Sequence, residues 1–212
     1  MAHKVELLGV VIDNKLNFKN HISKLIKKVG RQIYVLNRFK HILSFSTKIR
    51  IYRAFIMLHF TCCSSVWHNC LKEDSDRLEK LHERALRHVF NDFCKGYDGL
   101  CSKVGYLLSC RRKQDTLLII FKALNNSIPQ YIQSLFNIRE NKKNLRGRNK
   151  LVLPVAKTTT YGLKSTCYIA AKARNALPDN LRSVAEFARF RNDLRKLRNL
   201  YFYYTNLYLN LF

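Results

Sequence analysis

The chain has 212 residues, of which 47% are hydrophobic and 12% aromatic, and these fractions exclude wholesale disorder, which requires low hydrophobicity together with high charge. It holds 39 Lys and Arg against 14 Asp and Glu, a formal net charge of +25. Such a surplus repels itself unless a polyanion neutralises it. Nucleic acid is therefore the first partner that the composition predicts, and an anionic membrane surface the second.

The cysteine content and the first residues of the sequence bear on the compartment. The cysteines are odd in number, and the first apolar stretch, Leu7 to Ile12, is too short for a signal peptide or a membrane span. We expect reduced thiols in an intracellular protein, nuclear or cytoplasmic and not secreted, without a membrane-spanning segment. The seven cysteines are Cys62, Cys63, Cys70, Cys94, Cys101, Cys110 and Cys167.

The N-terminal third predicts a strand followed by helices. Residues 7–12 are apolar apart from Gly9, include the β-branched Val10, Val11 and Ile12, and end at a turn signal. They therefore indicate a strand with which residues 16–18 could pair as a hairpin. Residues 20–39 have apolar side chains at helical spacing and basic side chains on the other face. Residues 48–67 are apolar nearly all round and predict a buried central helix, with a cap in the Ser44 to Thr47 stretch.

The remainder of the chain continues the helical pattern. Asp76 and Glu79 have the spacing of a capping box at the start of a third helix near Asp74. The later elements, in chain order, are a helix over 111–125, an exposed basic loop over 139–150, an extended segment near 151–163, a short helix over 165–176 and a last helix over about 184–201. The fold class is therefore mainly α with a small N-terminal β element.

Catalytic and metal signatures are sparse. The sequence has no Gly-rich phosphate loop, no Gly-x-Ser-x-Gly and no His-Glu-x-x-His. Histidine and cysteine are zinc ligands, so one cluster could bind a metal, or its members could pack in the core. Its spacing matches no standard finger or knuckle, and we expect neither a metal nor a cofactor. The cluster comprises His59, Cys62, Cys63, His68 and Cys70.

Three basic stretches are candidates for contact with a phosphate backbone. Phosphate recognition requires Lys as a point charge and Arg as a planar fork on rigid elements. Each stretch alone could be no more than a solvated face, and their combination at +25 favours nucleic acid. The predicted contacts are Lys24, Lys27, Lys28, Arg31, Arg111, Arg112, Lys113, Arg146, Arg148, Lys150, Arg191 and Arg195.

An ordered series of short segments resembles a known family. The segments are Leu7–Asp13, Leu16–Phe18, His21–Ile22, Arg50–Phe55, His59–Phe60, Cys63–Trp67, Leu78–Arg87, Arg111–Gln114, Phe121–Asn126, Pro129–Ile132, Asn144–Gly147, Tyr161–Leu163 and Asn175–Asp179. Over about residues 5–195 this series resembles the region after the catalytic core of non-LTR (LINE, jockey-type) retrotransposon reverse transcriptases.

The resemblance implies a C-terminal, thumb-and-tail part of such an enzyme. It divides the chain into an end-of-palm β element (1–19), a thumb-like helical bundle (20–125) and a basic C-terminal region (126–212). In the family, the catalytic carboxylates lie in a Tyr-x-Asp-Asp box and an earlier Asp motif, both N-terminal to the matched region. The resemblance thus implies a non-catalytic piece that grips the backbone of RNA or an RNA–DNA duplex, with the polymerase palm as a second partner.

A second hypothesis belongs to a different functional class. The chain could be a protein-interaction or scaffold fragment, the product of a degenerate element, in which the charge has no specific nucleic-acid role. Binding to a hybrid duplex that weakens with salt separates the two hypotheses, because counterion release accompanies backbone contacts alone.

The chain is expected not to extend a primer. Two-metal phosphoryl transfer requires converging carboxylates, and the sequence has no Asp-Asp pair. Primer extension by the purified protein on an RNA template, with Mg²⁺ or Mn²⁺, should give no product. Template-dependent extension would overturn this expectation.

Overall fold

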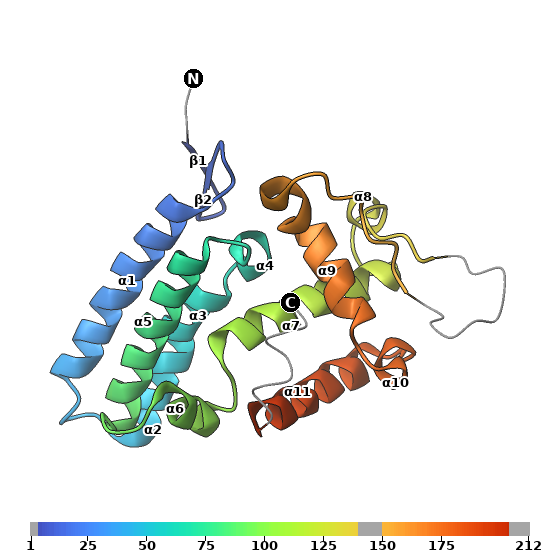
Figure 1. Cartoon of the computed structure of the whole chain (residues 1–212). Coiled ribbons are helices and arrows are strands. Elements are labelled where there is room, and N and C mark those ends of the chain that lie inside the picture. The colour runs from blue at the N-terminus through green and yellow to red at the C-terminus, as the bar shows by residue number, and fades with distance from the viewer. Residues whose placement is uncertain (1–3, 140–149, 204–212) are drawn as a thin grey trace. The chain divides into compact units, whose positions relative to one another are not determined.

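The computed structural model describes residues 4–139 and 150–203 and is mainly helical, with a small N-terminal hairpin, as predicted (Figure 1). The chain divides into two compact units, residues 1–112 and 113–212, and the division falls within helix α7 (Leu108–Leu124). The boundaries drawn from the sequence near residues 19 and 125 remain predictions. The two units are described separately below.

The hairpin of unit 1 is formed by other segments than the predicted ones, and its turn lies at residues 8 and 9. Strands β1 (Lys4–Leu7) and β2 (Val10–Asp13) pair antiparallel, with Leu7 opposite Val10. Leu8 and Gly9 form the two-residue turn with φ of 50° and 82°, the left-handed values that match the twist of paired strands. Residues 7–12 are thus not one strand, and the expected pairing with residues 16–18 was wrong.

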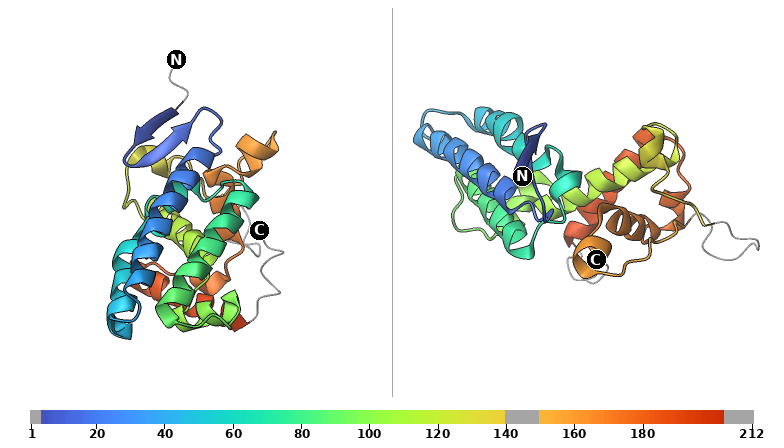
Figure 2. Two further views of the ribbon diagram at one scale, coloured as in Figure 1. Left: turned by 90° about the vertical axis from the view of Figure 1, so that its left-hand side faces the viewer. Right: turned by 90° about the horizontal axis from the view of Figure 1, so that it is seen from above.

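Two long amphipathic helices pack side by side in unit 1 (Figures 1 and 2). Helix α1 (Lys19–Arg38) confirms the helix predicted over residues 20–39, and α5 (Lys72–Phe90) confirms the third helix. Their apolar side chains recur at helical spacing, and this periodicity places them on one face. The buried positions are His21, Ile22, Leu25, Val29, Ile33 and Leu36 in α1, and Leu78, Leu81, His82, Ala85, Leu86 and Val89 in α5.

The predicted continuous helix over residues 48–67 is broken. It consists of α2 (Phe45–Ile51), a π-helical segment η1 (Tyr52–Ile56), α3 (Met57–Thr61) and α4 (Ser64–Trp67). The break falls at residues 62 and 63, where Cys63 has a left-handed φ of 49°. The buried Trp67 indole donates to the Cys62 carbonyl at 3.0 Å, so a side chain five residues further along the chain satisfies a group that the helix leaves unpaired. The Ser44 cap is confirmed, since its hydroxyl accepts from the Thr47 amide.

The capping box predicted at the start of α5 does not form. The helix begins at Lys72, so Asp74 already lies in its first turn, where an acid favours the positive end of the helix dipole. The side chain of Asp74 is buried and accepts from Arg77 at 2.9 Å. After α5 comes α6 (Tyr97–Val104), a helix that the sequence analysis did not predict.

Unit 2 has its own hydrophobic core. It contains the greater part of α7, followed by α8 (Gln130–Gln133), α9 (Thr166–Asn175), α10 (Asp179–Arg182) and α11 (Phe187–Tyr203). The core residues come mainly from α7, α9 and α11, and Phe121 stacks on Phe190 at 4.5 Å between ring centroids. The buried set is Leu117, Ile120, Phe121, Leu151, Ala170, Ala171, Ala173, Leu177, Leu181, Phe190 and Leu194.

The segment predicted to be extended over 151–163 is so only in its first part. Leu151 forms a bridge with Ile138, whereas Thr159–Leu163 forms a π-helical turn, η2. Threonine favours extended structure where a neighbouring strand supplies hydrogen bonds. Here the amides of Gly162 and Leu163 instead donate to the Thr158 carbonyl.

Alanine substitution of two glycines in unit 1 should change the free energy of unfolding in opposite directions. An added Cβ meets nothing within 4 Å at Gly30, inside α1, or at Gly9, where φ is +82°. Gly30→Ala should stabilise the fold by about 0.5–1 kcal/mol, because alanine has less backbone freedom to lose. Gly9→Ala should destabilise it by about 1 kcal/mol, because a side chain strains the left-handed turn. Urea denaturation of the full chain measures both, and a shared sign would contradict the backbone argument.

Candidate nucleic-acid interface

The first basic stretch forms an exposed face on α1. Lys24, Lys27, Lys28 and Arg31 are all exposed, on the side of the helix opposite its buried stripe, and we call these four residues the α1 basic face. Lys24 makes a 2.6 Å ion pair with Glu6 of β1, and both side chains are about half exposed. The structure thus confirms that these four predicted residues are displayed together.

The α1 basic face has few acids to neutralise it. Helix α1 contains six Lys and Arg and no Asp or Glu, whereas α5 contains five of each sign. Among the residues that the structure describes, Glu6 supplies the one ion pair that this face makes. The positive field also reaches neighbouring histidines. The pKa values of His21 and His59 are lowered first by burial and then by the charges of Lys24 and Lys28, respectively.

The second basic stretch does not form a surface contact set. Arg112 is 3% exposed, and its Nη2 donates to Ser75 Oγ at 2.9 Å and to Glu79 Oε1 at 3.4 Å. Its guanidinium also lies 5.7 Å from the centre of the Trp67 ring. An internal arginine cannot reach a phosphate backbone from this position, so its inclusion among the contacts was wrong. Arg111 and Lys113 are half-buried.

Arg112 belongs to a buried chain of hydrogen bonds that we call the His82 network. His82 is fully buried, with its Nε2 2.6 Å from the Tyr52 hydroxyl and its Nδ1 2.8 Å from the Tyr97 hydroxyl. Tyr97 donates to Glu79, which also accepts from Arg112. These directions are consistent with neutral His82 carrying its proton on Nδ1. Sequence reasoning missed the network because its members come from η1, α5, α6 and α7.

Burial sets the ionisation of this network. Burial first, and then the positive charge of Arg112, lower the pKa of His82 from 6.5 to about 3. Burial also raises the pKa of Glu79, against the opposing effects of Tyr97 and Arg112. Because His82 is fully enclosed, we assign the network to holding α5 against η1 and α6, and not to chemistry on a bound molecule.

The structure describes only part of the third basic stretch, which comprises the predicted contacts from Arg146 to Arg195. Arg146 and Arg148 lie outside the described residues. Lys150 is exposed at the start of the segment that leads to η2, and its carbonyl accepts from the Arg139 amide at 2.8 Å. Arg191 and Arg195 are exposed on α11. All of these positions belong to unit 2, so they are treated apart from the α1 basic face.

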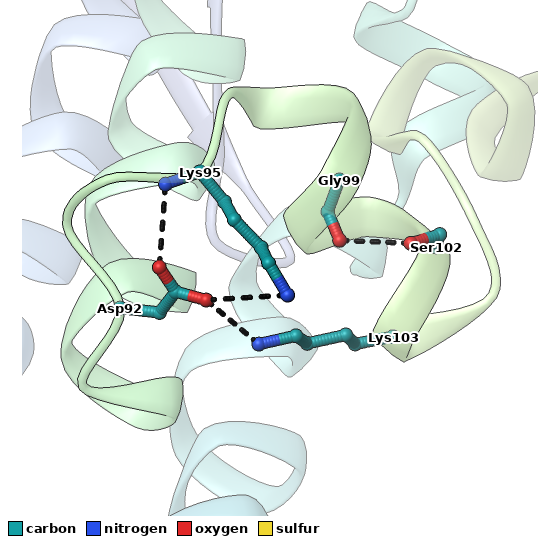
Figure 3. A network of polar contacts seen from close by, with 5 residues as sticks. All are labelled: Asp92, Lys95, Gly99, Ser102 and Lys103. Atoms are coloured by element: carbon teal, nitrogen blue, oxygen red, sulfur yellow. Dashed lines mark hydrogen bonds and ion pairs between the residues drawn. The ribbon is translucent and has the colours of Figure 1, made fainter.

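Other lysines show what a neutralised surface cation looks like. Figure 3 shows Asp92, whose Oδ2 lies 2.9 Å from Lys103 Nζ and 3.7 Å from Lys95 Nζ. The hydrogen bond to Lys103 is the main cause of the lowered pKa of the Asp92 carboxyl. Lys103 also lies 5.0 Å from the centre of the Phe90 ring. These two lysines share a local acid, whereas Lys27, Lys28 and Arg31 have none among the described residues.

The His and Cys cluster does not converge on a metal site. His59 Nε2 lies 3.0 Å from Gln32 Nε2, and His68 Nδ1 lies 3.0 Å from the Ser65 carbonyl oxygen. Cys70 is buried, and burial raises the pKa of its thiol. Over residues 4–139 and 150–203, no three His, Cys, Asp or Glu side chains lie where they could hold one ion.

Comparison with known proteins adds no relative. No family model, curated protein or solved structure matches the chain. None of the helices in the described ranges has the length and apolar character needed to cross a membrane.

The ionisation of His82 predicts a pH dependence of stability. In the unfolded chain the imidazole takes up a proton near pH 6.5, but in the fold it does so near pH 3. The unfolded state therefore binds one more proton between these values, so stability is complete above pH 6.5 and falls as the pH decreases. The slope should be about 1.4 kcal/mol per pH unit. Urea denaturation at several pH values between neutral and mildly acidic measures it.

His82→Gln should remove the contribution of His82 to this slope, leaving the smaller one of His21, His59 and His88. It should also lower the stability at neutral pH by about 1–3 kcal/mol, because it leaves a tyrosine hydroxyl without its partner. His41→Gln is the matched control, since His41 is exposed. The buried histidine would not be the cause if both variants kept the slope of the unchanged protein.

Proposed function

We propose that the chain is a non-catalytic, nucleic-acid-binding protein that holds the phosphate backbone of RNA or an RNA–DNA duplex through the α1 basic face. The observation that carries this proposal is the set of exposed cations on a helix without acids. The ordered resemblance to the thumb and tail of LINE-type reverse transcriptases supports the same assignment, since that part of the enzyme contacts duplex backbone.

The geometry suits recognition of backbone and not of base sequence. Lysine is a point charge that fits phosphate without the planar, two-bond geometry by which arginine reads guanine. Three of the four cations of the α1 basic face are lysines. Spacings of three and four residues place neighbouring side chains about 5–6 Å apart on one side of a helix, close to the separation of successive phosphates. We infer affinity that depends strongly on salt and weakly on sequence.

The test is a triple substitution that leaves the hairpin contact intact. Lys27→Ala, Lys28→Ala and Arg31→Ala remove the cations that have no acidic partner among the described residues, while the ion pair between Lys24 and Glu6 stays. Binding to an RNA–DNA hybrid should weaken for every sequence alike. The slope of log affinity against log salt should flatten by up to about one unit per lost phosphate contact. Fluorescence anisotropy at several salt concentrations measures both quantities.

The matched control removes the same charge from α5. Lys72→Ala, Lys80→Ala and Arg84→Ala take three exposed cations from a helix whose acids and bases balance. This control should leave the salt slope close to that of the unchanged protein. Equal loss in both triple variants would mean that net charge alone attracts the duplex, and the α1 assignment would be dropped.

One observation favours a protein-interaction role as a second candidate. An apolar groove of about 410 Å³ runs beside α1, and Val35, Phe39 and Phe55 on its walls are 52%, 44% and 59% exposed. Exposed apolar surface of this kind marks sites of protein contact. Phe55→Ser should reduce association with a protein partner or another copy of the chain, yet leave duplex binding unchanged. Unchanged association, or loss of duplex binding in this variant, would count against the second role.

A further inference from the structure

Helical segments form both sides of the apolar groove beside α1. Val35 and Leu36 of α1 and Phe39 directly after it line one side, and Ile51 of α2 and Phe55 of η1 line the other. Val35, Phe39 and Phe55 are about half exposed, whereas Leu36 is 2% exposed. The apolar surface therefore extends from an exposed rim into a concave interior, which a flat surface would not fill.

The backbone around the groove determines what form of chain fits it. The amide and carbonyl groups of both sides are paired within their helices, so an extended segment finds no free strand edge here. A segment that buries apolar side chains in the groove must satisfy its own backbone groups, as a helix does. The side along α1, from Arg31 to Phe39, spans about 12 Å at ~1.5 Å per residue. This length suits about two turns of a helix with apolar side chains at i, i+4 and i+7.

The charge around the groove gives a second property of its occupant. Residues 14–72, which supply every residue that lines the groove, contain twelve Lys and Arg and no Asp or Glu. Arg31 lines the groove itself, and Arg38 is exposed one helical turn from Val35. Neither arginine forms an ion pair with a residue that the structure describes. This surface complements a helix that has carboxylates beside its apolar stripe.

From the helical walls of the groove and its two exposed arginines, we infer that it binds an amphipathic helix of a partner protein, with acidic side chains beside the apolar stripe. The stripe packs between Val35, Phe39 and Phe55, and the carboxylates pair with Arg31 and Arg38. This inference specifies the partner for the protein-interaction role and rests on that role, not on duplex binding. A second copy of the chain is a poorer occupant, because it carries the same net charge of +25.

Three synthetic helical peptides with the same fluorescent label are the probes. The first has leucines at i, i+4, i+7 and i+11 with glutamates beside this stripe, and the second has glutamines in place of the glutamates. The third has the composition of the first, with its leucines spread around the helix. Fluorescence anisotropy with the full chain should show saturable binding of the first peptide. The second should bind about tenfold more weakly, because two surface ion pairs are lost, and the third should not saturate.

Substitutions of the protein test each part of the groove. Phe55→Ser should weaken binding of the first peptide about tenfold or more, because it removes apolar surface that the stripe covers. Val35→Ser should act in the same way and is measured if the first variant does not fold. Arg31→Gln combined with Arg38→Gln should weaken the first peptide about tenfold and leave the second unchanged, because only the first has carboxylates.

Phe93→Ser is the matched control for the apolar wall. Phe93 is 50% exposed and does not line the groove, so this variant should bind the first peptide as the unchanged protein does. The inference fails if the first peptide does not bind, if either other peptide binds equally well, or if Phe55→Ser and Phe93→Ser have equal effects.

Vesicles of phosphatidylcholine with phosphatidylserine test the other macromolecular surface that cationic and apolar residues could contact. Vesicle binding that Phe55→Ser reduces, with no binding of any peptide, would make the groove a membrane contact and overturn the inference. Binding of the RNA–DNA hybrid is measured separately. Failure of the peptides therefore leaves the duplex proposal standing, and failure of duplex binding leaves the groove inference standing.

Discussion

The protein has fourteen acidic side chains and thirty-nine lysines and arginines. The positions of the acids decide which of these cations are neutralised within the fold. Five of the acids lie on α5, where Asp74 holds Arg77 and Glu79 holds the buried Arg112. Another, Asp92, neutralises two lysines beyond the end of that helix. Because α1 has no acid of its own and Glu6 pairs with Lys24 alone on that face, the outer face of α1 keeps most of its charge.

The same shortage leaves the buried arginines Arg112 and Arg182 in different surroundings. Arg112 is buried with a carboxylate, a hydroxyl and an indole ring around it, so its charge is used within unit 1. Arg182 is buried to a similar degree, but its acid partner is exposed and two of its nitrogens are unbonded in the described structure. Burial alone therefore does not show how fully the donors of an arginine are matched within the fold. The difference lies in whether the surrounding acceptors match the donors.

The candidate site was predictable where one element supplies it. In α1, apolar residues and basic residues each recur every three to four positions, on opposite faces of the helix. This period can be recognised in the sequence alone, and it predicts the α1 basic face. Arg112 has the same local signature, since it lies between Arg111 and Lys113. Its burial depends on Glu79 and Trp67, which are 33 and 45 positions away in the chain. No local pattern carries that information.

Amino-acid order by itself determined the mainly helical class, the positions of α1, α5 and α7, the Ser44 cap and the surplus of positive charge. These features depend on interactions within a few residues, because helix periodicity and capping are local. Tertiary structure decided the enclosure of His82 by Tyr52 and the burial of Arg112 beside Glu79 and Trp67. Each depends on groups that are distant in sequence and meet only when apolar surfaces pack. Their burial then determines which polar atoms must find partners inside the fold.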